Sequence, residues 1–336
     1  MRLPVCLLLA AWLAPVAARA QDVPIDATQP FAAWLEEFVA EARGRGFSDE
    51  LLSRTVIRLE PLHRVVASDR TQAELTVTFA RYLASRLTPA VVQRGRELAG
   101  QHSRVLNSIE QKYDVQRRFM LSIWGMETRF GRVTGSTPIF QALATLAWEP
   151  RRATFFRNQL FDALTIVGNG YIDAASMTGS WAGAMGQPQF MPSSYLQYAV
   201  DFDGDGRRDI WRSSADALAS IANYLKGWHW KGDETWGREV QLTRAIRERI
   251  ADEVPQRTEG CFSMRDMTER RPLEEWRRLG VRLKGGAPLP EAELEAGLVE
   301  TEDRSFLVYT NYDAILRYNC AHHYALSVAL LADRLQ

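Results

Sequence analysis

The spacing of apolar residues predicts that most of this chain is helical. From about residue 30 to residue 130, apolar residues recur at intervals of three and four, as in Phe31, Trp34, Leu35, Phe38 and Val39. Helical segments separated by glycine-containing loops continue to about residue 186, and further helices are expected over 214–225 and 312–335. The main body is therefore expected to be mainly α.

The pattern changes between about residues 236 and 310. Short β-prone runs, such as 239–243 and 306–309, are interrupted there by glycine and proline, which is typical of a small α+β subdomain. We expect the last segment to be helical again and to return to the main body. The expected divisions are a leader over 1–20, an N-terminal helical region over 21–100, a core over 101–235, the α+β subdomain over 236–310 and a C-terminal helix over 311–336.

The first twenty residues have the pattern of a secretory signal peptide. Arg2 is followed by an apolar stretch that is short for a membrane span, and Ala18-Arg19-Ala20 is a small-x-small cleavage signal. Cleavage after Ala20 would release an exported protein; an uncleaved anchor is the alternative. Cys6 lies early in the apolar run, where a lipid-accepting cysteine is not expected.

Composition and charge exclude several classes of protein. The chain has 336 residues, 46% of them hydrophobic and 24% charged, so wholesale disorder is excluded. Without the leader it would keep 39 basic and 41 acidic residues, a net charge near −2 that argues against electrostatic binding of nucleic acid. Nucleotide-binding glycine patterns and the G-x-S-x-G motif are absent from the sequence. A neutral polymer such as a polysaccharide remains compatible with this composition.

Two cysteines, Cys261 and Cys320, remain after the leader is removed. Because an exported compartment is oxidising, an even pair favours a disulfide. Two separate buried thiols are the alternative.

Glu127 stands out as a carboxylate on an apolar helical face. At helical spacing it lies one turn after Ile123 and two turns after Met120, and Gly131 provides a helix stop. Burial and the negative end of the helix dipole would both raise the pKa of this carboxyl, as a general acid requires. The alternative is a structural glutamate paired with Arg129 or Arg132.

A polar, glycine-rich loop over residues 179–195 is a candidate for ligand binding. Small residues let a ligand approach the backbone, Gln187 and Gln189 can donate and accept hydrogen bonds, and aromatic rings can stack on sugars. An ordinary tight connection between helices would have a similar composition.

These motifs together resemble the lytic murein transglycosylase B family, whose members are relatives of lysozyme that cleave bacterial peptidoglycan. The resemblance rests on WGMETRFG around Glu127, on GSWAGAMGQPQFMPSSYLQYAVDFDGDG, and later on ANYL and RYNCAHHYA. It runs from about residue 30 to the C-terminus, so it implies a lysozyme-like catalytic core over 101–235.

The resemblance also implies roles for individual residues. The motif glutamate is the family's single catalytic carboxylate, which here is Glu127. The residues that would line the sugar cleft or lie near the acid are Ser180, Met185, Gln189, Tyr224, Tyr318, Asn319 and Tyr324.

The reaction that the resemblance implies needs one carboxyl group instead of the usual pair. Glu127 would protonate the glycosidic oxygen between N-acetylmuramic acid and N-acetylglucosamine and then deprotonate the muramyl 6-hydroxyl, leaving 1,6-anhydro ends. The alternatives are a hydrolytic muramidase on the same scaffold and a non-catalytic peptidoglycan-binding protein. Asp162 and Asp173 remain candidates for a second carboxylate.

The stretch from residue 201 to residue 209 matches the first nine positions of an EF-hand calcium loop. Its candidate ligands are Asp201, Asp203, Asp205, the carbonyl of Arg207, and Asp209. Position twelve, normally glutamate, is Arg212, and the resemblance implies that a later aspartate, nearest Asp216, completes the site. A structural Ca²⁺ is therefore expected. The alternatives are a solvated turn and, for Asp216, a helix-capping role with Ser213.

Overall fold

The computed structural model describes residues 29–70 and 77–336. The expected signal peptide and Cys6 lie outside these residues, so cleavage after Ala20 stays a prediction. Over the described ranges the fold is mainly helical with a small antiparallel sheet subdomain, as the sequence pattern predicts. None of the described helices combines the length and the apolar character that crossing a membrane requires.

The N-terminal part consists of short helices packed through their apolar faces. The apolar positions of α1 are buried as expected, and the ring of Phe38 stacks 4.7 Å from that of Phe161. Ser48 and Thr88 accept hydrogen bonds from the amides of the third residue after each and so begin α2 and α5. These helices are α1 (Phe31–Gly44), α2 (Asp49–Thr55), α3 (His63–Arg70), α4 (Phe79–Arg86), α5 (Pro89–Gln101) and α6 (Ser103–Tyr113).

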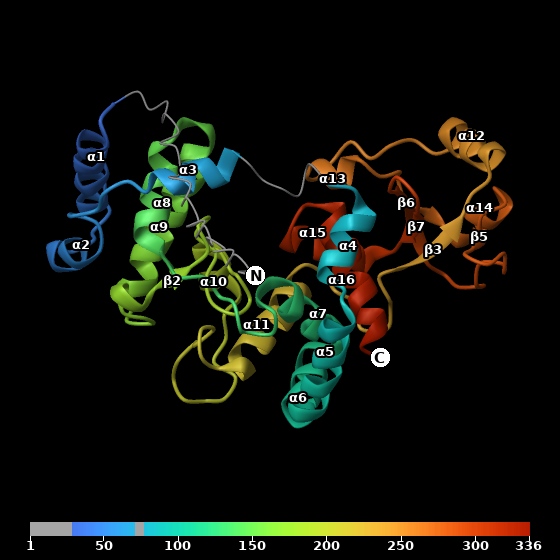
Figure 1. The fold of residues 1–336 in the computed structure, drawn as a ribbon, viewed down its shortest axis with the longest axis horizontal. Coiled ribbons are helices and arrows are strands. Elements are labelled where there is room, and N and C mark those ends of the chain that lie inside the picture. The colour runs from blue at the N-terminus through green and yellow to red at the C-terminus, as the bar shows by residue number, and fades with distance from the viewer. Residues whose placement is uncertain (1–28, 71–76) are drawn as a thin grey trace, which may run out of the picture.

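The middle of the chain forms the centre of the molecule. Helix α7 (Arg117–Thr128) is buried over most of its length and packs against α5, α11 and α16. The remaining elements are β1 (Thr137–Pro138), α8 (Ile139–Trp148), α9 (Ala153–Gly168), β2 (Thr178–Gly179), α10 (Pro192–Tyr198) and α11 (Ser214–Gly227), with short 3₁₀ turns at Pro150–Arg152 and Ala174–Ser176. In Figure 1, α8 to α10 lie with α1 and α2 at one end of the molecule and the main sheet lies at the other.

The sheet subdomain is a five-stranded antiparallel sheet in the order β4-β6-β7-β3-β5. Its inner face buries a core of its own around Trp276 and Leu307, and Trp276 Nε1 donates a hydrogen bond to Ala296 O at 2.9 Å. The elements are β3 (Gly237–Gln241), α12 (Arg244–Glu253), α13 (Phe262–Arg265), β4 (Arg271–Pro272), α14 (Leu273–Arg278), β5 (Arg282–Leu283), β6 (Glu295–Glu300) and β7 (Ser305–Val308).

The C-terminal segment returns to the main body as two helices, where the sequence pattern predicts one. Helix α15 (Thr310–Tyr318) and helix α16 (His322–Arg334) are separated because Asn319 and Ala321 are extended, with φ −147° and −144°. Cys320 lies in this break and forms a disulfide with Cys261 of the sheet subdomain. Helix α16 then packs against α7, and the hydroxyl of Ser122 donates to Val328 O at 2.6 Å.

Two large hydrophobic cores meet in the centre of the fold. One surrounds α7 and α16, and the other surrounds α8 and α9. Tyr318 packs against both, so the end of α15 lies at the boundary between them.

Candidate active site

Glu127 lies near the end of α7, and its side chain is half-buried. The helix ends there because Arg129 and Phe130 take left-handed conformations (φ 50° and 61°), followed by Gly131 at φ 78°. A Cβ atom on Gly131 would lie 2.5 Å from Gln187 Oε1, so this position favours glycine both sterically and by its φ angle. The turn therefore places the carboxyl group of Glu127 close to the glycine-rich loop.

Tyr324 holds the carboxyl group of Glu127 directly. The Tyr324 hydroxyl, on buried α16, donates a hydrogen bond to Glu127 Oε1 at 2.5 Å. Burial and then the negative charge of Glu127 raise the pKa of Tyr324 well above its ordinary value. The phenol therefore keeps its proton and acts as a fixed donor to the acid.

Tyr318 joins the acid to the glycine-rich loop. Its pKa is raised by burial and then by the charge of Glu127, which places the two side chains near each other. Its hydroxyl donates to Pro188 O at 2.6 Å, and its ring lies 5.8 Å from Phe190 and 4.7 Å from Tyr224. Tyr224 in turn donates to Arg317 O at 2.5 Å. The structure thus groups Tyr224, Tyr318 and Tyr324 on the same side of α7 as Glu127.

Ser180 and Met185 shape the loop from within. The Ser180 hydroxyl accepts hydrogen bonds from the amides of Ala182 and Ala184 at 3.3 and 3.1 Å. Met185 is fully buried, and its backbone pairs with that of Phe190. Both residues therefore stabilise the loop's conformation.

Gln189 and Asn319 complete the predicted set. Gln189 has φ 53°, and its side-chain amide donates to Thr134 O at 3.1 Å and to Gly186 O at 2.9 Å. Asn319 is half-buried in the break between α15 and α16, beside Tyr318. The carbonyl oxygen of the Gln189 side chain and the side chain of Asn319 are the polar groups of this region that can meet a ligand.

Gln187 is a structural residue of the site that sequence reasoning did not single out as such. Its side-chain oxygen accepts from Trp124 Nε1 at 2.9 Å, and its backbone oxygen accepts from Thr128 Oγ1 at 2.8 Å. The backbone N–H of Gln187 donates to Ile210 O, and its side-chain Nε2 donates to Trp211 O. Gln187 thereby ties α7, the glycine-rich loop and the acidic loop together, a role that no spacing in the sequence signals.

Asp201, Asp203 and Asp205 meet at the tip of the acidic loop. One carboxylate oxygen from each lies within 4.8 Å of the others. Gly204 and Gly206 take positive φ angles of 79° and 85°, which let the loop turn tightly enough for the three carboxylates to converge. Three hard oxygen donors in this arrangement fit a divalent cation such as Ca²⁺.

Asp209 and Asp216 bind backbone amides. Asp209 Oδ1 accepts from the amides of Trp211 and Arg212. The buried carboxylate of Asp216 accepts from the amides of Phe202, Asp203 and Asp209, while its own amide is capped by Ser213. Burial raises the pKa of Asp216 above its ordinary value. The structure therefore supports the capping role of Asp216 and places its carboxylate outside the cluster of three.

The two candidates for a second carboxylate lie on the α8–α9 side of the molecule. Asp162 is half-buried on α9, and burial raises its pKa. Asp173 lines a polar cavity of about 550 Å³ together with Asp209 and Trp211. Neither is recorded as a hydrogen-bond or charge partner of Tyr318 or Tyr324, the tyrosines whose pKa values Glu127 affects.

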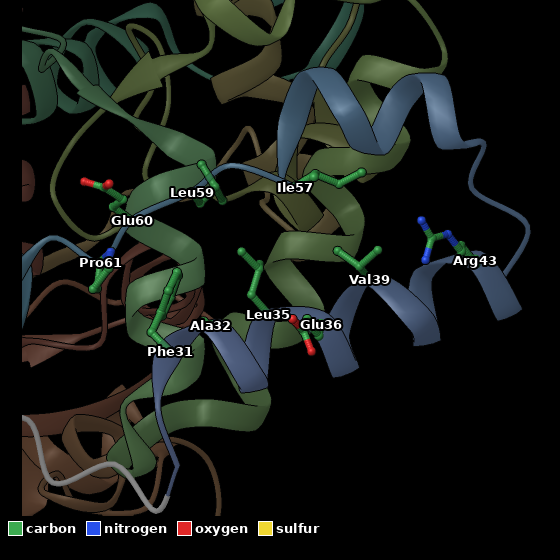
Figure 2. Close-up of a pocket in the computed structure, with 10 residues that line it drawn as sticks. All are labelled: Phe31, Ala32, Leu35, Glu36, Val39, Arg43, Ile57, Leu59, Glu60 and Pro61. Atoms are coloured by element: carbon green, nitrogen blue, oxygen red, sulfur yellow. The ribbon is translucent and has the colours of Figure 1, made fainter.

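The cavity drawn in Figure 2 is separate from Glu127. It has a volume of about 540 Å³ and lies between α1 and the segment after α2, with Leu35 and Val39 on one wall and Ile57 and Leu59 on the other. Its lining includes the carboxylates of Glu36 and Glu60 but none of the residues of the predicted sugar cleft, so its size alone does not make it the functional site.

A helical fold with one acidic side chain bonded to a tyrosine, beside aromatic rings and a side-chain amide, is the arrangement expected of a glycan-processing enzyme. The family model described as the transglycosylase SLT domain matches residues 30–333. The chain belongs to this family, which confirms the resemblance seen in the sequence motifs.

Individual relatives agree with this assignment. The chain is 35% identical over 254 residues to membrane-bound lytic murein transglycosylase B of Escherichia coli (strain K12). The matched residues make up 74% of this chain and 64% of the length of that protein. The chain resembles the structure of SltB3 from Pseudomonas aeruginosa in complex with NAG-anhNAM-pentapeptide, with a TM-score of 0.82 and 40% identity. The match covers 91% of this chain and 80% of SltB3. The chain also resembles the structure of the Escherichia coli lytic transglycosylase SLT35 in complex with calcium, with a TM-score of 0.75 and 30% identity. This match covers 92% of this chain and 93% of SLT35.

Proposed function

We propose that this protein is a lytic transglycosylase that cleaves the β-1,4 bond between N-acetylmuramic acid and N-acetylglucosamine in peptidoglycan and leaves 1,6-anhydro ends. The observation that carries the proposal is the hydrogen bond from Tyr324 to Glu127 beside the aromatic cluster of Tyr224 and Tyr318. Family membership and the similarity to SltB3, crystallised with a fragment that contains an anhydro sugar, support the same reaction.

The proposed reaction uses the carboxyl group of Glu127 twice, first as an acid and then as a base. Glu127 donates it to the glycosidic oxygen, and the bond from that oxygen to C1 of the muramyl sugar breaks with its electron pair going to oxygen. The carboxylate then accepts the proton of the 6-hydroxyl as O6 bonds to C1, which closes the anhydro ring and restores the acid. The attached hydroxyl competes with water because its effective concentration at C1 is very high.

Tyr324 is proposed to position the acid for both steps. Its hydroxyl donates a hydrogen bond to Oε1 of Glu127 and so holds the carboxyl group in one orientation while it exchanges a proton with the substrate. A donor bond also stabilises the carboxylate that forms after the first transfer. In this proposal Gln189 and Asn319 bind the sugars, and Ser180, Met185, Tyr224 and Tyr318 give the cleft its shape.

We propose a structural Ca²⁺ at the acidic loop, held by Asp201, Asp203 and Asp205 with the carbonyl of Arg207. The calcium complex of SLT35 supports the choice of metal. The loop leads to Ile210 and Trp211, whose carbonyls are bonded to Gln187, so the metal would brace the floor of the glycine-rich loop. Asp209 and Asp216 as further ligands stay a prediction, since the converging carboxylates are those of Asp201, Asp203 and Asp205.

The protein is proposed to act in the periplasm after cleavage behind Ala20. The leader pattern and the disulfide between Cys261 and Cys320 both suit an exported protein. Its proposed partner is the peptidoglycan glycan strand.

Digestion of purified sacculi with the mature protein tests the proposal. We expect released muropeptides whose masses are lower by one water than hydrolysis products and whose ends resist borohydride reduction. Reducible ends would instead assign a hydrolytic muramidase, and absence of release would indicate a binding protein. Glu127→Gln, prepared in the same way, controls for contaminating enzymes.

A further inference from the structure

A pocket lined by arginines lies beside the end of α7, and Glu127 is not among the residues that line it. It has a volume of about 310 Å³ and is bounded by the end of α4, the start of α5 and the turn that follows α7. Four guanidinium groups line it, from Arg86, Arg94, Arg129 and Arg132, and the described lining residues include no carboxylate. The active-site chemistry described above makes no use of these charges.

The arginines are largely available to a ligand. Arg129 and Arg132 are exposed, and within the described residues the side chain of neither forms a hydrogen bond or an ion pair. Arg94 contacts the exposed carboxylate of Glu97 at 3.2 Å, a solvent-screened pair of the kind that contributes little. The guanidinium group of Arg86 lies 5.5 Å over the ring of Tyr82. Planar guanidinium groups that converge on a pocket of this size are suited to a carboxylate, which they can bind through paired hydrogen bonds.

The position of the pocket indicates which part of a substrate would reach it. The pocket is bordered by Gly125 and Met126 of α7 and by Arg129 in the turn that follows the helix. Around the helix, Glu127 points roughly 200° away from Gly125. The scissile bond itself therefore cannot occupy the pocket while it contacts the acid. A substituent on the reacting sugar can, because α7 ends at Thr128 and the chain need only pass around that end.

The length of a peptide stem matches this path. An α-helix with side chains is about 10–12 Å across, and an extended peptide covers about 3.3–3.6 Å per residue. Three or four residues joined to the lactyl group of N-acetylmuramic acid would therefore carry a carboxylate from the acid to the pocket. In this geometry the stem's own carboxylates supply the negative charge.

We propose that the pocket of Arg86, Arg94, Arg129 and Arg132 binds a carboxylate of the peptide stem and gives the enzyme a preference for stem-bearing glycan. The inference rests on the proposed transglycosylase function and assigns it a substrate determinant. The stem would add binding energy at a distance from the bond that breaks, so it would act mainly on KM.

The test compares two substrates that differ only in their stems: glycan strands with intact peptides, and the same strands after an amidase has removed them. For the wild-type protein we expect kcat/KM to be higher on the stem-bearing strands. The preference for stems is the kcat/KM on stem-bearing strands divided by the kcat/KM on stem-free strands. In the double variant Arg86→Gln/Arg132→Gln, this preference ratio should fall about tenfold, since charge-assisted hydrogen bonds are lost. Arg81→Gln/Arg104→Gln removes two exposed arginines outside the pocket and should leave the ratio unchanged.

Direct binding provides a second readout. The free stem tripeptide, titrated into Glu127→Gln protein and followed by amide NMR shifts, should perturb residues 125–132 in that protein and lose this effect when the two pocket substitutions are added. Three outcomes would overturn the inference: a preference ratio in the pocket variant equal to that of the wild-type protein, a wild-type protein that does not prefer stem-bearing strands, or the same fall in the Arg81→Gln/Arg104→Gln control. Release of anhydro products from both substrates alike would overturn the pocket alone, whereas no anhydro product from either would overturn the proposed function.

Discussion

Glu127 and the Asp201–Asp205 loop hold carboxylates in two different ways. Glu127 is single, half-buried and bonded to the hydroxyl of Tyr324, among aromatic side chains. The three aspartates are close together, mostly exposed, and shaped by two glycines in left-handed conformations. One isolated acid with a neutral donor is suited to moving a proton, whereas three converging carboxylates are suited to holding a cation.

The comparison shows that the partners of a carboxylate, more than its identity, determine its chemistry. Asp216 illustrates this from a third position, because its buried oxygens accept three backbone amides and so hold the loop's shape. Gln187 connects the two regions through Trp124 on one side and Ile210 on the other. Substitutions can therefore separate proton transfer from cation binding.

Glu127→Gln should give the largest effect. Glutamine keeps the size of the side chain but cannot exchange a proton, so turnover on sacculi should fall by about 10³-fold or more. Release of anhydro muropeptides measured by mass spectrometry checks this, with an unchanged melting temperature as the folding control. Residual turnover within tenfold of the wild-type rate would remove Glu127 from the mechanism.

Tyr324→Phe should give the next largest loss. The change removes the donor that orients Glu127, and hydrogen bonds to charged groups contribute about 1.5–3 kcal/mol, so kcat should fall about 10- to 100-fold. KM should change little, because the hydroxyl acts on the acid. The matched control is Tyr312→Phe, which removes a hydroxyl of α15 that lies 3.0 Å from His322 Nδ1 of α16. Equal losses in both variants would indicate a packing effect.

Cation binding should affect stability more than catalysis. A cation that binds the folded state at about 100 times its Kd adds about 2.7 kcal/mol, which corresponds to roughly 5 °C in melting temperature for a chain of this size. A chelator should lower the melting temperature and calcium should restore it. Asp201→Asn/Asp203→Asn should abolish the calcium response, while Asp252→Asn, an exposed aspartate on α12, should retain it. A melting temperature indifferent to calcium would argue against the site.

A smaller effect, a pH dependence of the free energy of unfolding, should arise from His322, which belongs neither to the Glu127 region nor to the acidic loop. Burial lowers the pKa of His322 below its ordinary value of 6.5, so below pH 6.5 the unfolded chain binds more protons than the folded one. The free energy of unfolding should therefore decrease as the pH falls from 6.5 towards the folded-state pKa. Denaturant melts across this range should show a weaker pH dependence for His322→Gln. The same slope in both proteins would exclude His322 as the cause.

Local patterns in the sequence predicted the features that depend on near neighbours. The three- and four-residue spacing of Phe31, Trp34 and Phe38 corresponds to the buried face of α1. The alternate aspartates of the acidic loop converge as their EF-hand spacing predicts. Such features need only a few consecutive residues, so the sequence carries enough information to place them.

Features that depend on distant parts of the chain were not predictable from spacing. Tyr324 is 197 residues from Glu127, and only the family resemblance predicted that the two residues lie close together. The structural role of Gln187 depends on four partners from two distant segments, α7 and residues 210–211. The break between α15 and α16 also escaped prediction, because no glycine or proline marks residues 319–321.

The disulfide at this break makes the region around Glu127 depend on the redox state of its compartment. It closes a span of 59 residues, a constraint worth about 4 kcal/mol by chain-entropy arguments, and it anchors the turn between Tyr318 and Tyr324 to the sheet subdomain. In a reducing cytosol the thiols would stay apart and the two tyrosines would lose this anchor. If the protein is exported as proposed, this anchor forms only outside the cytosol, in the compartment that also holds the proposed peptidoglycan substrate.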